Sequence, residues 1–285
     1  MEFLGHLKEL LQIICWRIRR YFLILGQRLF VFLVPRRARF LFDDDDTEES
    51  YGAKFFSKLV SCLIILPIMY YFFSSYMPFG FWEFWHMPSS WAAVIQSYWP
   101  FIVWGIAIQS IVSFTGYNKP EDNHYAEGHL VAGFLRSGFA GITEEITFRW
   151  LFFLVAIPGL RVGNWFIFGF AGFGLKEWMY LHILGPIVNL VSLGLMHNLL
   201  FDPRGWFIGA SLVATNAFFR DGHKYQGIIG FINSWFGGLV LFHAAFTYGL
   251  PCAILVHTTF NMVVNLVAYV DAIIEREFLG IRLQR

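Results

Sequence analysis

Charged residues are scarce in this chain, and their scarcity decides the class of protein. Only 14% of the 285 residues are Asp, Glu, Lys or Arg, whereas 57% are hydrophobic and 20% are aromatic. A soluble domain carries about 25% charged residues, so this chain could not cover its own surface with groups that water solvates. The composition excludes an ordinary soluble protein and indicates that lipid surrounds much of the molecule.

Cysteines are few, and the net charge is close to zero. The three cysteines, Cys15, Cys62 and Cys252, lie far apart and without CxxC spacing, so neither a disulfide framework nor a cysteine-based metal site is expected. The 21 basic and 20 acidic residues nearly cancel. Because nucleic-acid-binding proteins carry an excess of positive charge, no nucleic-acid partner is expected. Membrane lipid is the first partner that the sequence implies.

Long runs without charged residues locate the expected membrane spans. A bilayer core about 30 Å thick requires about 20 apolar residues in a helix. Residues 225–270 are long enough for two spans with a reversal at 248–251, and a short or re-entrant helix is expected over 166–175. Further spans are expected at 59–78, 91–114, 130–160, 179–201 and 206–219. The sequence predicts an all-α, polytopic transmembrane bundle of about seven or eight spans.

The two ends of the chain are more polar than its middle. Residues 1–50 combine an arginine-rich amphipathic segment, expected to lie on an anionic membrane surface, with the acidic linker Asp43–Asp46. Arginines also cluster in the tail, residues 272–285. Because positively charged segments stay on the cytoplasmic side, we expect an integral, multi-pass protein with both termini in the cytoplasm.

Ionisable residues inside an apolar span are costly, so each one requires a reason. The segment 141–150 holds two adjacent carboxylates, Glu144 and Glu145, followed by Arg149. Glu145 and Arg149 are four residues apart, so they share a helical face and can form an ion pair. Glu144 points about 100° away around the helix. An ion-pair clamp between helices would explain Glu145 and Arg149 but not the second carboxylate, for which we expect a function.

Two later motifs carry histidines that could act with Glu144. One is Phe219-x-x-x-His223, and the other is His257-x-x-x-Asn261 inside the last expected span. His257 and Asn261 share a helical face, and both can donate hydrogen bonds. Taken singly, His223 would more often be an interfacial anchor, and His257 with Asn261 would more often join neighbouring helices.

In combination and in this order, the three motifs resemble those of the CAAX-protease and bacteriocin-processing (CPBP, or Abi) family of intramembrane proteases. They stand here as Glu144-Glu145 with Arg149, Phe219 with His223, and His257 with Asn261. The resemblance covers about Ala132 to Val270, so we expect a protease core in 129–271, preceded by two transmembrane helices in 51–128. It also implies that substrates are membrane-associated or prenylated proteins or peptides.

Residue chemistry and the resemblance assign the same roles. No serine or cysteine lies beside a histidine as a covalent nucleophile requires, so an activated water is expected to attack the peptide bond. Glu144 and His223 would bind and deprotonate that water, and His257 and Asn261 would donate to the oxyanion. The ion pair of Glu145 with Arg149 would hold the motif in place.

Metal dependence is an open alternative. Glu144, His223 and His257 would make a plausible zinc site of two histidines and one carboxylate, although the chain contains no HExxH motif. We favour a mechanism without metal or other cofactor, because Asn261 then has a role.

Two further alternatives concern the second histidine and the class of protein. His197 competes with His223, although it lacks a phenylalanine four residues earlier. The gap between Glu144 and His223 is longer than the resemblance leads us to expect, which implies an inserted span. A transporter or a non-catalytic membrane scaffold would also bury such polar groups. The protease hypothesis requires that Glu144, His223 and His257 converge on one cavity.

Overall fold

The computed structural model describes residues Tyr51–Tyr76, 79–115, 130–172 and 174–278, together with positions 12, 16–18, 20–24 and 28. Within these residues every regular element is a helix, and there is no strand. Most of the expected N-terminal amphipathic segment, the acidic linker and most of the C-terminal tail lie outside the described residues.

Five helices in the described part of the chain are long and apolar enough to cross a membrane. They lie in α2 (Tyr51–Phe73), α3 (Trp91–Thr115), the continuous helix from α4 (Leu130–Glu144) through η5 (Glu145–Phe152) to α5 (Phe153–Phe166), α10 (Gly227–Tyr248) and α11 (Leu250–Phe278). The protein is a membrane-embedded, all-α helical bundle, as the composition predicts. The expected count of about seven or eight spans is wrong.

Two of the expected spans do not form single helices of spanning length. The run at 179–201 is divided among α6 (Leu175–Met179), η7 (Tyr180–Leu184), α7 (Gly185–Val191) and α8 (His197–Leu200). Leu193 and Gly194 lie between α7 and α8 with φ angles of 53° and 78°, and this left-handed backbone ends a right-handed helix. The helix α9 (Trp206–Asp221) has 16 residues, about 24 Å at 1.5 Å per residue.

The connection from α5 to α6 also differs from the expectation. Instead of a short helix over 166–175, this stretch is a loop that contains only the single 3-10 turn η6 (Gly169–Ala171). In contrast, the predicted reversal at 248–251 is confirmed, because α10 ends at Tyr248 and α11 begins at Leu250. Gly249 between them has a φ of 91°, which favours glycine because it has no Cβ.

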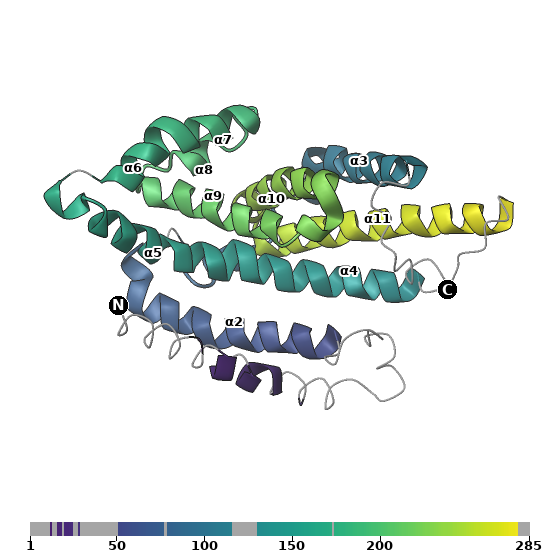
Figure 1. Cartoon of the computed structure of the whole chain (residues 1–285), viewed down its shortest axis with the longest axis horizontal. Coiled ribbons are helices and arrows are strands. Elements are labelled where there is room, and N and C mark those ends of the chain that lie inside the picture. The colour runs from purple at the N-terminus through teal and green to yellow at the C-terminus, as the bar shows by residue number, and fades with distance from the viewer. Residues whose placement is uncertain are drawn as a thin grey trace. The chain divides into compact units, whose positions relative to one another are not determined.

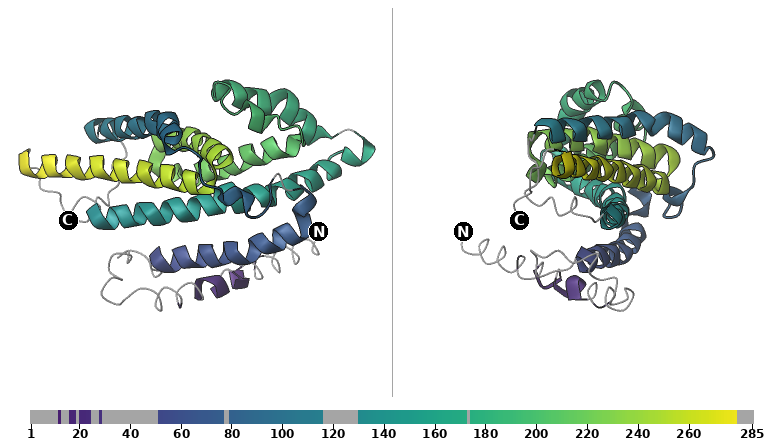
Figure 2. Two further views of the ribbon diagram at one scale, coloured as in Figure 1. Left: turned by 180° about the vertical axis from the view of Figure 1, so that it is seen from behind. Right: turned by 90° about the vertical axis from the view of Figure 1, so that its right-hand side faces the viewer.

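The chain divides into two compact units, Met1–Leu66 and Pro67–Arg285. Among the described residues of the first unit, the main element is the beginning of α2. In the second unit, α11 packs against α3, α4 and α10, and α9 packs against α5 and α10. Figures 1 and 2 show α4 and α11 running side by side.

Small residues allow the helices to approach closely in the region that matters for function. A Cβ at Gly141 on α4 would collide with the hydroxyl of Thr258 on α11, and a Cβ at Gly238 on α10 would collide with the Asn216 side chain on α9. Close packing at small residues is how membrane helices gain van der Waals contact. It brings the end of α4 and the ends of α9 and α11 to one place.

Candidate functional site

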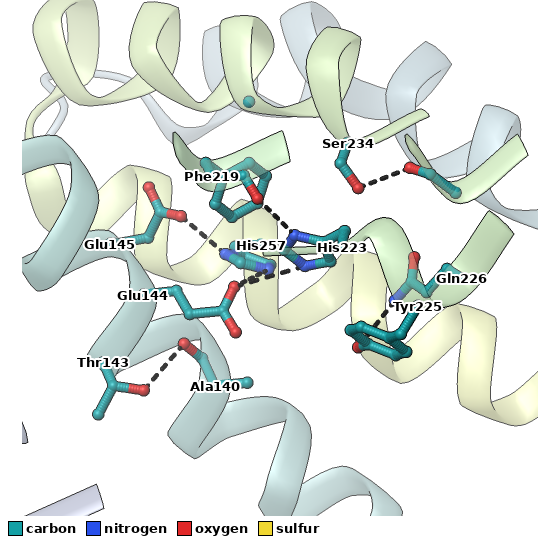
Figure 3. Close-up of polar contacts among 12 residues, drawn as sticks. Ala140, Thr143, Glu144, Glu145, Phe219, His223, Tyr225, Gln226, Ser234 and His257 are labelled. Atoms are coloured by element: carbon teal, nitrogen blue, oxygen red, sulfur yellow. Dashed lines mark hydrogen bonds and ion pairs between the residues drawn. The ribbon is translucent and has the colours of Figure 1, made fainter. Parts of the chain in front are cut away.

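Polar side chains from α4, η5, α11 and the segment that follows α9 lie close together, as Figure 3 shows for Glu144, Glu145, His223 and His257. Glu144 is the last residue of α4, and Glu145 and Arg149 lie in the π-helix η5. His223 follows the end of α9, and His257 lies in α11. A wider π-helical turn changes the register of the side chains that follow, and such turns are frequent at functional sites.

Glu145 and Arg149 form a fully buried ion pair. The Arg149 Nε lies 3.1 Å from the Glu145 Oε2, and both side chains are 0% exposed. The guanidinium lies 4.2 Å from the ring centre of Phe219 and 5.0 Å from that of Phe242, and it donates to the Gly238 carbonyl at 3.4 Å. Two aromatic faces and a carboxylate therefore replace water around this cation.

Glu145 also orients His257. The Glu145 Oε1 lies 2.7 Å from the Nδ1 of His257, which is 5% exposed. One carboxylate thus contacts Arg149 through one oxygen and His257 through the other, as Figure 3 shows for the His257 contact. Such a carboxylate–histidine contact fixes the ring and directs the other nitrogen, Nε2, towards Glu144.

His223 is oriented in a similar way by a backbone group. Its Nδ1 donates to the carbonyl of Phe219 at 2.7 Å, one helical turn earlier. This contact explains the spacing of the Phe219-x-x-x-His223 motif, because a helix places the carbonyl of residue i beside residue i+4. The ring of Phe219 packs at 4.6 Å from the His223 ring while covering Arg149, so it links the two halves of the site.

Glu144 faces both imidazole rings. Its Oε2 lies 3.9 Å from the His223 Nε2 and 3.8 Å from the His257 Nε2, and this oxygen is buried without a hydrogen-bond partner among the described residues. These separations exceed the 2.7–3.2 Å of a direct hydrogen bond and suit groups that share a bridging water. The side chains of Glu144 and His223 remain 25% and 19% exposed, so a substrate can reach this point.

The position of Asn261 follows from the helix α11, and no hydrogen bond among the described residues orients its side chain. It lies one turn after His257 on α11 and is partly exposed; within the described residues its side chain makes no hydrogen bond. One turn further, Asn265 donates to the Ser137 hydroxyl at 2.7 Å and to the Gly133 carbonyl at 3.4 Å. The structure therefore brings five of the six sequence-predicted residues into one connected group and leaves Asn261 beside it.

The rival histidine lies elsewhere. His197 is exposed in α8, and its ring contacts Phe201 at 5.1 Å. Among the described ion pairs and hydrogen bonds, none joins His197 to Glu144, whereas His223 faces Glu144 directly. The choice of His223 as the second-motif histidine agrees with this geometry.

Two supporting residues were not assigned a role from the sequence. Phe242 forms one wall around the Arg149 guanidinium, and the Gly238 carbonyl accepts from it. The adjacent glycines at 237 and 238 are a visible signal in an otherwise bulky helix. Phe242 gives no such signal, because an aromatic residue in an apolar helix resembles any other lipid-facing or core position.

The donor types suit zinc, and their spacing in this structure is slightly wider than that of ligands on a bound ion. Ligand atoms bound tetrahedrally at about 2.0–2.2 Å lie about 3.3–3.6 Å from one another, closer than the 3.8 and 3.9 Å found here. In the described part of the chain no group of three or more His, Cys, Asp or Glu side chains has the spacing of a metal site. We therefore derive no catalytic step through a metal.

No family model matches the chain, and comparisons with curated proteins and with solved structures also give no match. The functional interpretation rests on the chemistry of the site itself.

Proposed function

We propose that the protein is an intramembrane endopeptidase of the type that its motifs resemble, the CPBP proteases. The observation that supports this proposal is the convergence of Glu144, His223 and His257 on one partly exposed point inside an apolar helix bundle. A carboxylate and two imidazoles held by a second layer of hydrogen bonds are suited to acid–base chemistry on a water molecule.

The proposed reaction begins with a water bound between Glu144 and the Nε2 of His223. The Glu144 carboxylate takes a proton from this water as the oxygen attacks the scissile carbonyl carbon. Glu144 then passes the proton to the leaving amine as the peptide C–N bond breaks. No covalent intermediate with the protein forms in this mechanism.

Two donors on α11 would stabilise the negative charge that develops on the carbonyl oxygen. His257, whose Nδ1 is held by Glu145, would donate to the oxyanion through Nε2. Asn261, one turn away on the same face, would supply the second donor once a substrate is bound. Arg149 acts only through Glu145, by holding that carboxylate against His257.

The charged residues beside His223 support a substrate that approaches from the membrane surface. Arg220, Asp221 and Lys224 flank His223, and the Asp221 carboxylate contacts both cations, at 2.8 and 3.0 Å. Asp221 and its two cationic partners therefore form a charged cluster at this end of α9. We propose membrane-associated or prenylated proteins or peptides as substrates.

The deciding experiment is the Glu144→Gln variant, which keeps the shape of the side chain but removes the carboxylate. Substrates are first found by comparing peptides from membranes that express wild type or variant. Purified Glu144→Gln should then melt at the wild-type temperature and cleave at least about 100-fold more slowly, the usual scale for a general base. Full cleavage by this variant would end the proposal.

A matched control separates this effect from a general loss of charge. Glu177→Gln makes the same substitution on α6, outside the site, and should leave cleavage unchanged. If instead Glu144→Gln loses stability and every variant of the site melts early, the polar group is an ion-pair clamp of a scaffold or transporter. Loss of cleavage on treatment with 1,10-phenanthroline, with recovery on addition of zinc, would favour the zinc-dependent alternative.

We also infer that both chain ends are cytoplasmic, from the arginines near each of them. Both ends share a side only if the number of crossings is even, whereas five helices in the described residues have the length and composition of spans. The helix α9, with 16 residues, would make a sixth crossing only together with the residues that flank it. Impermeant labels on cysteines introduced near Ser50 and near Phe79 should report opposite sides of the membrane.

A further inference from the structure

A second feature stands apart from the site: the apolar hairpin, defined here as residues 175–201. Its outgoing arm runs through α6, η7 and α7, and its return arm contains α8. Figures 1 and 2 show α6 and α7 extending to a turn from which α8 leads back to α9. No Asp, Glu, Lys or Arg occurs from Met179 to Phe201. Charged residues lie at the two ends of the hairpin: Lys176 and Glu177 in its first turn, and Asp202 and Arg204 directly after it.

The turn of the apolar hairpin is exposed and strongly apolar. Leu190, Leu193 and Leu195 are 76%, 88% and 69% exposed, and Ile187 on the outgoing arm is 53% exposed. The exposed residues cover both the flank of the helix and the turn itself. A water-soluble surface rarely gathers leucines in this way, so something apolar must cover them.

The backbone conformation at the turn also indicates that the turn is not in water. Leu193 has a φ of 53°, a left-handed conformation that glycine or asparagine adopts at lower energetic cost than a leucine. A turn in water would gain from a glycine or asparagine here, both in backbone energy and in solvation. A leucine is favourable at this position only if its side chain leaves water.

The turn also meets the main requirement for non-helical backbone in lipid, which is that polar groups be paired within the chain. The N–H groups of Ser192, Leu193 and Gly194 donate to the carbonyls of Val188, Leu190 and Asn189 at 2.9, 3.0 and 2.8 Å. The N–H groups of Leu195 and His197 donate to the carbonyls of Ser192 and Gly194, both at 3.1 Å. The reversal therefore presents few unpaired backbone donors.

The two arms are held together at their base. The buried Tyr180 hydroxyl donates to the Leu200 carbonyl at 2.8 Å, and Met196 and Leu200 are 1% and 0% exposed. The outgoing arm from Leu175 to Val191 comprises helices of five, five and seven residues. That length is about 25 Å, less than a bilayer core of about 30 Å, and the chain then turns back.

We infer that the apolar hairpin is re-entrant: its turn lies among the acyl chains of one leaflet, and both of its ends lie on the same side of the membrane. The arrangement of charge supports lipid as the partner, because charged residues lie at the two ends of the hairpin while its turn has none. Trp178 and Trp206 lie at the two ends, as tryptophans do at membrane–water interfaces. A second protein copy would cover one flank, whereas lipid covers the flank and the turn together.

The test uses the full-length protein with Cys15, Cys62 and Cys252 replaced by alanine, reconstituted in phosphatidylcholine vesicles. Single cysteines are introduced at Leu193, at Lys176 and Pro203 on the two ends, and at the exposed Val103 within the α3 span. Lys176→Cys and Pro203→Cys should react with an impermeant maleimide from the same side. Leu193→Cys should react only after the vesicles are dissolved in denaturant.

Depth is measured with a bimane label in vesicles whose lipids carry bromine on their acyl chains. The label at Leu193 should be quenched as strongly as the label at Val103, and the label at Pro203 should not be quenched. Labelling of 176 and 203 from opposite sides, ready reaction of 193 with the impermeant reagent, or disulfide cross-linking of 193 between two copies would each overturn the inference.

A second variant provides an independent readout. Leu193→Asn relieves the backbone strain, so it should raise the melting temperature if the turn is in water and lower it in vesicles if the turn is in lipid. Leu193→Gly distinguishes the effect of backbone strain on the melting temperature from the effect of side-chain polarity, because it relieves the strain without adding a polar group. None of these measurements depends on the proposed protease activity, since the hairpin residues lie outside the candidate site.

Discussion

The site around Glu144 and the apolar hairpin make an informative pair, because both place histidines and a π-helical turn in an apolar stretch of sequence. In the site, the rings of His223 and His257 are held through Nδ1 by an oxygen acceptor and face a carboxylate through Nε2. In the hairpin, His182 and His197 are exposed, with rings against Trp178 and Phe201. A histidine in an apolar run is therefore not a functional signal until its partners are known.

The two regions also differ in what holds them together. The site depends on a buried charge pair, Glu145 with Arg149, in which each side chain is 0% exposed. The hairpin depends on neutral contacts, mainly the Tyr180 hydroxyl with the Leu200 carbonyl and the packing of Met196. Substitutions that remove a charge should consequently reduce the stability of the protein strongly in the site and weakly near the hairpin.

The largest effect is expected for Arg149→Gln. This change removes the cation of the buried pair and leaves Glu145 only its contact with His257. Removing one partner of a buried ion pair typically destabilises a protein by about 3–5 kcal/mol. The variant should accumulate poorly in membranes or melt at a much lower temperature in detergent. Arg204→Gln is the matched control: the Arg204 side chain is 52% exposed, so its loss should cost less than about 1 kcal/mol. Equal melting temperatures for wild type and Arg149→Gln would show that the pair contributes no net stability.

The second effect compares the two histidines directly. His223→Asn should reduce cleavage of the identified substrate by about 100-fold or more, because it removes a nitrogen that binds the attacking water. His197→Asn should leave cleavage unchanged, because His197 lies away from Glu144. The measurement is kcat/KM of purified variants that have passed the same thermal-melting check. If His197→Asn reduced cleavage and His223→Asn did not, His197 and not His223 would be the histidine of the site.

The third effect separates two asparagines on one face of α11. Asn261→Ala should slow cleavage by roughly 100- to 1000-fold, the loss seen when one oxyanion donor is removed, and should leave the melting temperature unchanged. Asn265→Ala removes the hydrogen bonds to Ser137 and Gly133 and should cost about 1 kcal/mol of stability with little change in kcat. If Asn261→Ala instead destabilises without slowing cleavage, Asn261 has a packing role only.

Local features of the site follow from sequence spacing alone. The i, i+4 spacing of Glu145 and Arg149 predicts the ion pair that the structure contains at 3.1 Å. The spacing of Phe219 and His223 likewise agrees with the carbonyl contact at 2.7 Å. The contact between Glu145 and His257 joins residues 112 positions apart, so only packing of α4 on α11 brings them together. Hydrophobic periodicity does not show which residues of two packed helices lie opposite one another.

The wrong span count has a different physical origin. A hydropathy run shows that residues prefer lipid but does not show whether the helix continues through it. The break at 192–196 depends on left-handed conformations at Leu193 and Gly194, and leucine gives no warning of such a conformation. An apolar run of spanning length can therefore fold as a hairpin, and its charged flanks do not distinguish the two outcomes, since both predict charge at the ends.

The smallest effect is expected at the base of the hairpin, where Asp202 accepts from the Arg204 backbone and guanidinium at 2.6–2.9 Å. Burial alone would raise the pKa of Asp202, but the hydrogen bonds and positive charge of Arg204 outweigh burial and hold this pKa below its usual value. The ionised carboxylate therefore stabilises the folded protein at pH values above the unfolded pKa of about 3.9, and this contribution is lost as the pH falls through the folded pKa.

Asp202→Asn should thus lower the melting temperature at pH 7 by an amount that corresponds to less than about 1 kcal/mol, because Arg204 is half-exposed and solvent screens the pair. The difference between wild type and variant should shrink as the pH falls below about 4. Thermal melting of both proteins in the same detergent across this range provides the measurement. Asparagine keeps an oxygen that accepts from the Arg204 backbone, so a difference that persists at low pH would assign the effect to side-chain packing at the hairpin base. If the difference in melting temperature at pH 7 were several times larger, charged contacts would stabilise the hairpin as strongly as they stabilise the site. The proposed difference between the two regions would then be wrong.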